Sequence, residues 1–181
     1  CLFHEKTIQK DLLGVSHMAI TPRQNSLEGL QANNYYYTQL PNVPWGIVLN
    51  NSHINEERAY TTLAHELGHY LGLLHVFGEK DCEETDYCDD TPSYNREEYI
   101  ASLTEGMQEQ ELFNRMGCDG NPFVSYNIMD YDYSHLNQFT LDQYKRVRHV
   151  LENSPLIPGP KNITVTKSLG GDSKPEIQIM K

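Results

Sequence analysis

The stretch TTLAHELGHYLGLLHVFG, residues 61–78, begins as an amphipathic helix and then meets a glycine where a good helix former would be expected. Residues of an α-helix advance by about 100° each, so His65 and His69 lie roughly 40° apart on one face, one turn from each other. Two imidazoles placed in this way can bind one zinc ion, and the carboxylate of Glu66 then reaches a water on the metal. This is the H-E-x-x-H pattern, in which the glutamate acts as general base.

The next histidine, His75, requires the helix to end before it. In an unbroken helix it would point about 120° away from His69 and lie roughly 9 Å further along the axis, out of reach of the same metal. Gly72 is placed to end the helix, because glycine enters the left-handed conformation without steric cost and commonly follows a helix end. We therefore predict a break at Gly72, after which three neutral histidines and one water complete a tetrahedral zinc site.

Chance is the alternative explanation of this pattern. A single histidine on an apolar helix face is more often a core residue, and H-E-x-x-H alone also arises by accident. The longer H-E-x-x-H-x-x-G-x-x-H pattern fixes five positions, and we expect a chance match in roughly one in ten thousand chains of this length. This specificity favours the zinc site.

Composition excludes several classes of partner. The 181 residues match one ordinary domain that is long enough to bury a core. A formal net charge of -11 would repel the phosphate backbone of nucleic acids. No apolar run approaches the roughly 20 residues that span a bilayer, so no transmembrane segment is predicted.

The hydrophobic pattern predicts strands before the helix and a second helix near the C-terminus. Residues 12–20, LLGVSHMAI, and residues 45–51, WGIVLNN, are the predicted strands. The zinc helix is expected to begin with Asn55 as its N-cap. Thr140 and Gln143 form a capping box for the second helix, which ends before Ser154 and Pro155. Its apolar residues fall on one face: Leu141, Tyr144, Val147 and Leu151.

Two motifs also resemble those of a known group. HELGHYLGLLH, residues 65–75, resembles the zinc-binding signature of the metzincin metalloproteases, whose second mark is a methionine in a tight turn beneath the metal. YNIMDY, residues 126–131, supplies such a methionine. Together with HVFG, DYCDDTP and NQFTLDQ, these stretches look like the pappalysin (cytophagalysin, M43-like) family. The resemblance covers roughly residues 45–154.

The resemblance implies roles for the matching residues. Met129 would form the hydrophobic floor under the zinc histidines. Tyr131 matches the tyrosine that, in some metzincins, binds the metal or stabilises the tetrahedral intermediate, although packing is the alternative in a chain with 12 tyrosines. The zinc ligands and the general base would be His65, His69, His75 and Glu66.

The resemblance also implies the fold. We expect an α+β, metzincin-like catalytic domain: a twisted mixed sheet with the active-site helix, then a mostly irregular C-terminal subdomain with a C-terminal helix. Residues 1–75 would form the N-terminal subdomain, residues 76–157 the C-terminal one, and residues 158–181 a linker or the start of a further domain. Metzincins usually place several strands and a long helix before the zinc helix. We therefore expect a truncated N-terminal subdomain, with Cys1 an internal residue of a longer precursor.

The acidic loop at residues 78–92, GEKDCEETDYCDDTP, has two interpretations. Its carboxylates suit Ca²⁺, which takes six to eight oxygen ligands, whereas a run of charges is more often a solvated surface. Pappalysins bind calcium near this loop. The resemblance therefore implies candidate calcium ligands at Asp86, Asp89, Asp90 and Thr91.

The four cysteines lack the paired C-x-x-C spacing of a zinc ribbon, so disulfides and buried thiols are the alternatives, and their spacing selects no connectivity. The resemblance implies that Cys118 pairs with a cysteine of the acidic loop, with Cys82 preferred over Cys88. The family commonly has another cysteine a few residues after the tyrosine of the methionine turn. This chain lacks it, so one of the usual disulfides is expected to be absent.

Together these features predict a zinc-dependent endopeptidase that hydrolyses protein or peptide substrates outside the cell. Zinc would activate its bound water, Glu66 would carry the proton to the leaving amine, and Tyr131 would donate to the oxyanion. The resemblance implies that residues 45–51 are the edge strand that aligns an extended substrate. The alternatives are a non-catalytic zinc-containing surface domain and a metal-dependent hydrolase of a non-peptide substrate.

Disulfides and a calcium-suited loop fit an extracytoplasmic setting, and the resemblance implies a secreted or cell-surface enzyme. The sequence leaves open whether a precursor carries a lipid anchor, an inhibitory prosegment or additional domains.

Overall fold

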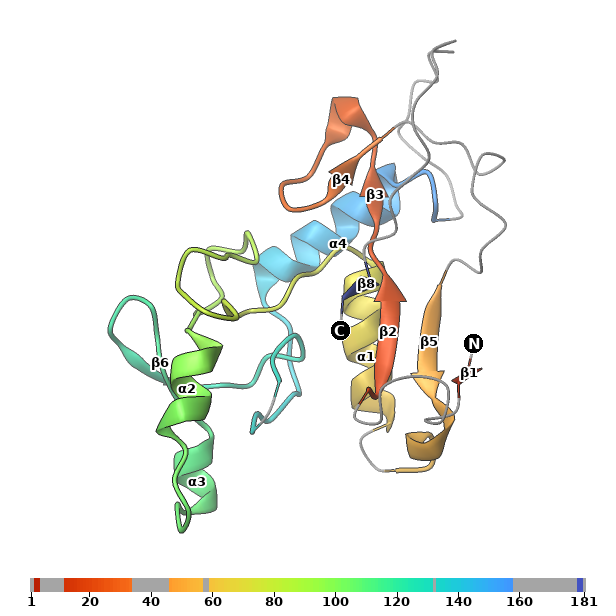
Figure 1. Ribbon diagram of the computed structural model, residues 1–181. Coiled ribbons are helices and arrows are strands. Elements are labelled where there is room, and N and C mark those ends of the chain that lie inside the picture. The colour runs from red at the N-terminus through yellow and green to blue at the C-terminus, as the bar shows by residue number, and fades with distance from the viewer. Residues whose placement is uncertain are drawn as a thin grey trace. The chain divides into compact units, whose positions relative to one another are not determined.

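The structure is a computed structural model that describes residues 2–3, 12–33, 46–56, 59–131, 133–157 and 179–180 (Figure 1). Helices and strands are mixed along the chain, in agreement with the α+β class. Cys1, Trp45 and residues 158–178 of the expected linker lie outside the described residues.

The helices and strands are short. The helices are α1 (Ala59–Tyr70), α2 (Arg96–Ser102), α3 (Glu109–Leu112) and α4 (Leu141–Asn153), with 3-10 turns at Arg23–Asn25 and Asn51–His53. The strands are β1 (Leu2–Phe3), β2 (Gly14–His17), β3 (Ile20–Thr21), β4 (Gln31–Ala32), β5 (Ile47–Asn50), β6 (Asn114–Met116), β7 (Pro122–Val124) and β8 (Ile179–Met180). No helix among the described residues has both the length and the apolar character needed to cross a bilayer. The chain divides into two compact units, residues 1–72 with 146–181 and residues 73–145.

A four-stranded sheet in the order β1-β5-β2-β8 belongs to the first unit. Strand β5 runs parallel to β1 and antiparallel to β2, and β2 is also antiparallel to β8. The expectation that β5 is an edge strand for a substrate is therefore wrong, because both of its sides pair with other strands. The strand predicted over residues 12–20 also divides, since β3 leaves this sheet and pairs with β4.

Helix α1 packs against β2 and β5 (Figure 1). The predicted N-cap, Asn55, lies in the turn before the helix. The carbonyl of Glu56, not that of Asn55, accepts the amide of Ala59 at 3.0 Å, so the described helix begins later than predicted. The buried residues of α1 are His65, Glu66, Gly68 and His69.

In the core of the first unit, α4 packs against the end of α1. Its buried residues are Ala19, Val150 and Ile157, and Leu27, Leu30, Tyr70 and Leu71 pack around them. The apolar face predicted for α4 is largely exposed: Leu141, Tyr144 and Leu151 are 63%, 58% and 39% accessible. The helix instead buries Gln143 and Arg146 beside Val150, because both polar side chains find hydrogen-bond partners.

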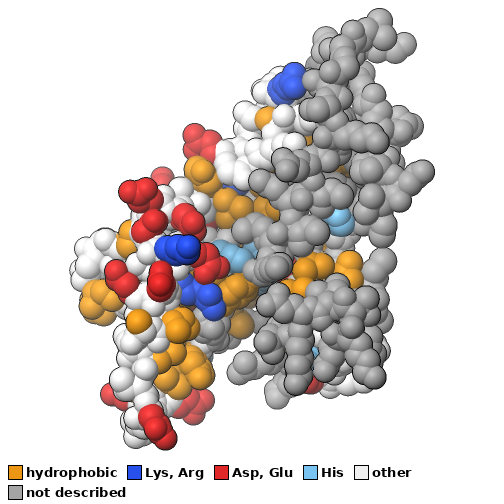
Figure 2. Space-filling view, viewed as in Figure 1, with side chains coloured by type: hydrophobic (Ala, Val, Ile, Leu, Met, Phe, Trp, Pro, Cys, Tyr) orange, Lys and Arg blue, Asp and Glu red, His pale blue; other side chains and the backbone are white. Residues whose placement is uncertain are grey.

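The second unit is mostly irregular, with α2, α3 and the β6–β7 hairpin. Its interior is aromatic and centres on Arg115, whose guanidinium carbon lies 3.6 Å from the ring centroid of Tyr99 and 5.1 Å from that of Tyr94. Asp130 accepts the hydroxyl of Tyr94 at 2.6 Å and lies 3.8 Å from the Arg115 guanidinium. Acidic side chains gather on the surface of this unit (Figure 2). Those exposed in the loop after His75 include Glu79, Asp81, Glu83, Glu84, Asp89 and Asp90.

Candidate metal centre

The two histidines of α1 face the same point. His65 and His69 are 7% and 1% exposed, and their Nε2 atoms lie 3.1 Å apart. Two nitrogens bound to one tetrahedral zinc at about 2.1 Å would lie roughly 3.4 Å apart. The i, i+4 spacing therefore brings the two nitrogens close to the separation at which both could bind one ion.

The zinc helix ends where the sequence predicts, just before Gly72. Helix α1 stops at Tyr70, the Gly72 amide donates to the carbonyl of His69 at 2.9 Å, and Gly72 adopts a φ of 91°. A Cβ on Gly72 would lie 2.7 Å from Cγ2 of Val150 and 2.9 Å from Cδ1 of Leu30. Glycine is therefore required here both by the left-handed backbone and by the tight packing around it.

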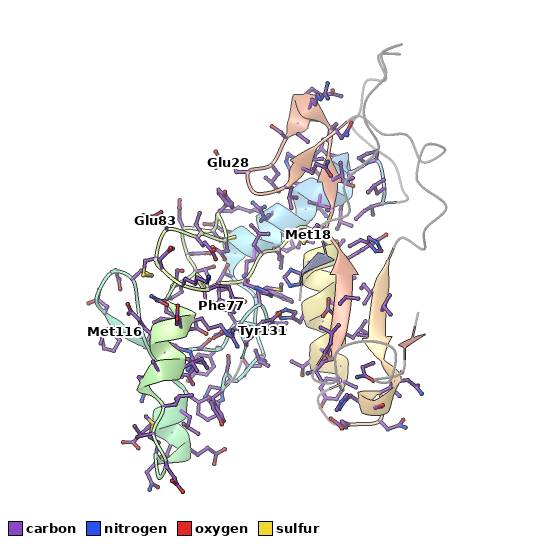
Figure 3. All side chains as sticks on the ribbon, viewed as in Figure 1. Met18, Glu28, Phe77, Glu83, Met116 and Tyr131 are labelled. Atoms are coloured by element: carbon purple, nitrogen blue, oxygen red, sulfur yellow. A yellow bond between two sulfur atoms is a disulfide. The ribbon has the colours of Figure 1, made fainter. Side chains whose placement is uncertain are left out.

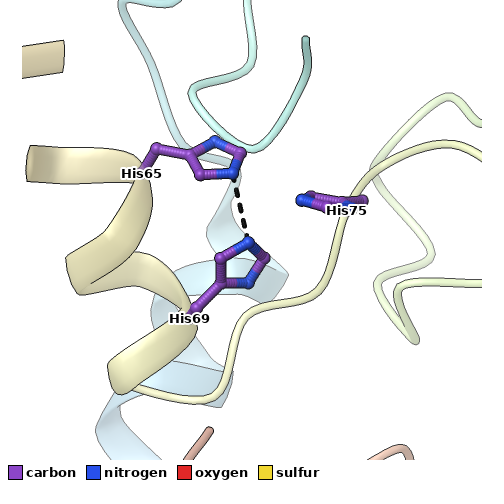
Figure 4. Close-up of side chains that lie close together, drawn as sticks. All are labelled: His65, His69 and His75. Atoms are coloured by element: carbon purple, nitrogen blue, oxygen red, sulfur yellow. Dashed lines mark hydrogen bonds between the residues drawn. The ribbon is translucent and has the colours of Figure 1, made fainter. Parts of the chain in front are cut away.

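Beyond this turn, the chain presents the third imidazole. His75 is 8% exposed, and one ring nitrogen from each of the three histidines lies within 4.8 Å of the others (Figure 4). Within the part of the chain that the structure describes, this is the one group of three or more histidine, cysteine or carboxylate side chains able to hold a metal ion. Three neutral imidazoles form a donor set suited to catalytic zinc, which keeps a fourth position open.

Glu66, next to the first of these histidines, is a buried carboxylate. Its side chain is 6% exposed, and Oε2 has no hydrogen-bond partner among the described residues. Burial raises the pKa of Glu66 to about 8. A buried carboxylate oxygen without a hydrogen-bond partner is costly to the fold, which makes Glu66 a candidate for a functional role.

The structure adds Gly14 of β2 to this site. A Cβ at Gly14 would lie 2.8 Å from both Cγ and Oε1 of Glu66. The strand thus approaches the helix closely enough to leave no room for a side chain opposite the carboxylate. Sequence reasoning missed this residue, although a glycine inside an apolar strand is the signal of a close approach.

Met129 lies in a buried turn of the second unit. Its side chain is 0% exposed, its amide donates to Oδ1 of Asn127 at 2.9 Å, and its carbonyl accepts the amide of Val76 at 3.4 Å. Asn127 is held in turn by Gln143 through bonds of 2.9 and 3.2 Å. Gln143 also makes the predicted capping box with Thr140, at 3.0 and 3.3 Å. The role of Asn127 was not predicted from the sequence.

Tyr131 lies beside the third histidine. Its ring centroid is 4.4 Å from that of His75 and 5.2 Å from that of Phe77, and the guanidinium carbon of Arg96 lies 5.4 Å from it. Tyr131 and Phe77 are labelled in Figure 3. Asp130 accepts the amide of Tyr131 at 2.7 Å. Tyr131 thus packs against the rings of His75 and Phe77. Its catalytic role stays a prediction.

The candidate calcium ligands make hydrogen bonds within the second unit. The Asp90 carboxylate accepts the amide of Asp142 at 3.0 Å. Desolvation is the largest single influence and raises the pKa of Asp90, but hydrogen bonds from Thr140 and from the amides of Asp142 and Leu141 together outweigh it and hold the pKa below its ordinary value. Asp86, 4% exposed, accepts the amide of Cys88, and Thr91 lies 3.3 Å from Thr140, oxygen to oxygen. Asp89 is exposed. Calcium binding by these four residues stays a prediction.

Cys82 and Cys118 form a disulfide with Cα atoms 5.7 Å apart. This is the pairing that the family resemblance implies. Cys88 is buried, and its sulfur lies 3.6 Å from the carbonyl oxygen of Asp86. The bridge closes a loop that contains Asp86 and the other residues of the acidic segment that follow Cys82, and so restrains them in the unfolded chain as well.

The region that contains both motifs is similar to known proteases. The family model described as pregnancy-associated plasma protein-A, of the M43 peptidases, matches residues 18–152. An extracellular metalloprotease of Arthroderma gypseum is 30% identical over 146 residues, which make up 78% of this chain and 43% of that protein.

Two further relatives match a shorter part of the chain. An extracellular metalloprotease of Arthroderma benhamiae is 37% identical over 89 residues, 48% of this chain and 29% of that protein. One of Aspergillus fumigatus is 34% identical over 93 residues, 48% of this chain and 26% of that protein. The chain thus spans less than half the length of these relatives.

Proposed function

The chain belongs to the pappalysin (M43) family of metalloproteases, and from this premise we propose that it is a zinc-dependent endopeptidase acting on extracellular proteins. One observation carries the proposal: three imidazoles lie together, and the carboxylate that follows the first of them in sequence is buried, with one oxygen that has no hydrogen-bond partner among the described residues. A structural zinc site would need a fourth protein ligand and would gain nothing from that carboxylate.

The proposed mechanism assigns proton transfer to Glu66. When bound by His65, His69 and His75, zinc supplies a Lewis acid that polarises a carbonyl and acidifies water. The Glu66 carboxylate takes the proton of the attacking water and delivers it to the leaving amine. Its buried position keeps bulk water from competing for that proton, and the close approach of Gly14 supports a fixed orientation of the carboxylate.

Tyr131 and Met129 have supporting roles in this proposal. The Tyr131 hydroxyl donates to the substrate oxygen as that oxygen gains negative charge, and the contact of its ring with His75 supports this role. Met129 forms the apolar floor of the site. Its complete burial and the hydrogen bond that its carbonyl accepts from the amide of Val76, next to His75, support that assignment.

We further propose that the protein is secreted. The relatives that it matches are named extracellular metalloproteases, and the Cys82–Cys118 disulfide suits an oxidising compartment.

Metal content and proteolysis test this function together. The purified chain is expected to hold one zinc ion and to cleave a denatured protein such as reduced casein. A chelator should abolish the cleavage, and added zinc should restore it. A chain that binds stoichiometric zinc but cleaves neither denatured protein nor a peptide library would instead be a non-catalytic zinc domain. Cleavage of small amides or esters alone would indicate the non-peptide hydrolase.

Gly14→Ala is expected to slow peptide hydrolysis by about tenfold to a hundredfold while zinc affinity is unchanged. The new methyl group would push the Glu66 carboxylate out of place, and a displacement of about 1 Å can cost a hundredfold in rate. Steady-state kinetics and zinc titration measure the two effects separately. Val15→Ala is the control, because adjacent strand residues point to opposite faces of the sheet. A Gly14→Ala enzyme with the wild-type rate would show that the carboxylate tolerates the displacement.

A further inference from the structure

Arg146 of α4 reaches the turn that follows the zinc helix. Its side chain is buried, with the residue 5% exposed. Nε donates to the carbonyl oxygen of Gly72 at 2.7 Å, and Nη2 donates to the carbonyl oxygen of Glu28 at 2.5 Å. A guanidinium presents its donors in a rigid planar fork and stays charged at every physiological pH. One buried cation therefore ties the end of α1 to the loop before β4.

The end of α1 is a favourable place for this cation. The last carbonyl groups of a helix lack donors within the helix and carry the negative end of its dipole. Gly72 is also the residue at which the backbone changes direction between His69 and His75. A hydrogen bond to its carbonyl fixes the orientation of the peptide that leads towards the third histidine.

The same helix packs against the other side of the turn. Val150 follows Arg146 by one helical turn, so both lie on one face of α4. Cγ2 of Val150 lies 2.7 Å from where a Cβ on Gly72 would be, and Cδ1 of Leu30 closes the space at 2.9 Å. Gly72 is thus held by a hydrogen bond through its carbonyl and by apolar contacts around its Cα.

We propose that Arg146 is a positioning residue of the zinc site, which holds the Gly72 turn in the conformation that presents His75. This inference rests on the proposed zinc function. Arg146 acts through the Gly72 backbone and keeps the site preorganised. When a site is assembled in only a fraction of the molecules, its apparent dissociation constant rises by the inverse of that fraction.

Zinc affinity tests this role without any measurement of proteolysis. Arg146→Gln is expected to raise the zinc dissociation constant by about tenfold or more, the usual range for residues that orient metal ligands. Arg146→Lys keeps the positive charge but not the planar guanidinium, so its loss of zinc affinity should be smaller. Competition with a chromophoric chelator gives the constants, and the visible spectrum of the Co²⁺-loaded chain reports the ligand geometry. The control is Arg148→Gln, because Arg148 lies on the same helix, exposed and paired with Glu152 at 2.8 Å.

The possible results separate this inference from the proposed function. Loss of zinc affinity and an altered Co²⁺ spectrum in the Arg146 variants, with wild-type values for Arg148→Gln, support the inference. Variants that melt earlier without metal but bind zinc with the wild-type constant and spectrum would make Arg146 merely structural. If Arg146→Gln does not fold, the zinc dissociation constant of Arg146→Lys is the test: a raised constant supports the inference, and a wild-type constant contradicts it. A wild-type chain that binds no zinc would overturn the proposed function itself.

Discussion

A Glu66→Gln variant is expected to keep its zinc and to hydrolyse peptides about 10²–10⁴-fold more slowly than the wild type, the range that a general base contributes. Glutamine has the size of glutamate and fits the same space beside Gly14, but its amide cannot accept and carry the water's proton. The zinc dissociation constant should stay near the wild-type value, because the histidines are unchanged. Peptide kinetics and chelator competition on the same preparation measure both quantities.

The same substitution should not destabilise the metal-free chain. The wild-type carboxylate is buried and one of its oxygens has no partner among the described residues, so the neutral amide removes a desolvation cost. Urea unfolding of the metal-free chain measures this effect. Glu97→Gln, at an exposed position of α2, is the control and should leave hydrolysis, zinc binding and stability unchanged. Wild-type hydrolysis by Glu66→Gln would remove Glu66 as the base, and a loss of zinc would make it a structural part of the site.

A Gly72→Ala variant is expected to bind zinc about tenfold or more weakly with all three histidines intact. Alanine in the left-handed conformation costs about 1–2 kcal/mol, and its methyl group would press on Val150 and Leu30 at 2.7 and 2.9 Å. The turn must shift to relieve both, and His75 lies just beyond it. Zinc titration and urea unfolding measure the two losses.

Gly106 provides a matched control for Gly72. Its φ is 92°, close to the 91° of Gly72, but a Cβ there would meet nothing within 4 Å. Gly106→Ala should therefore show the cost of the backbone conformation without the packing clash, and should bind zinc normally. If Gly72→Ala binds zinc as tightly as Gly106→Ala does, the packed turn is not needed to place His75.

Local patterns in the sequence predicted the centre of the candidate site. Helical periodicity places His65 and His69 together, a glycine after the last turn marks the helix end, and a capping box begins α4, because each of these depends on residues only a few positions apart. Sheet order could not be predicted in this way. Whether β5 is an edge strand depends on its pairing with Leu2–Phe3, far away in sequence.

The sequence by itself determined which residues are candidates for the metal and the base, since the ligand types and the helix break are encoded within residues 65–75. The tertiary structure decided what surrounds them. It places Gly14 against Glu66 and Arg146 on the Gly72 carbonyl, and it turns inward the face of α4 that carries Gln143, Arg146 and Val150, not the predicted apolar face. These contacts join residues distant in the chain, and their energies depend on burial and hydrogen-bond geometry that no local sequence pattern specifies.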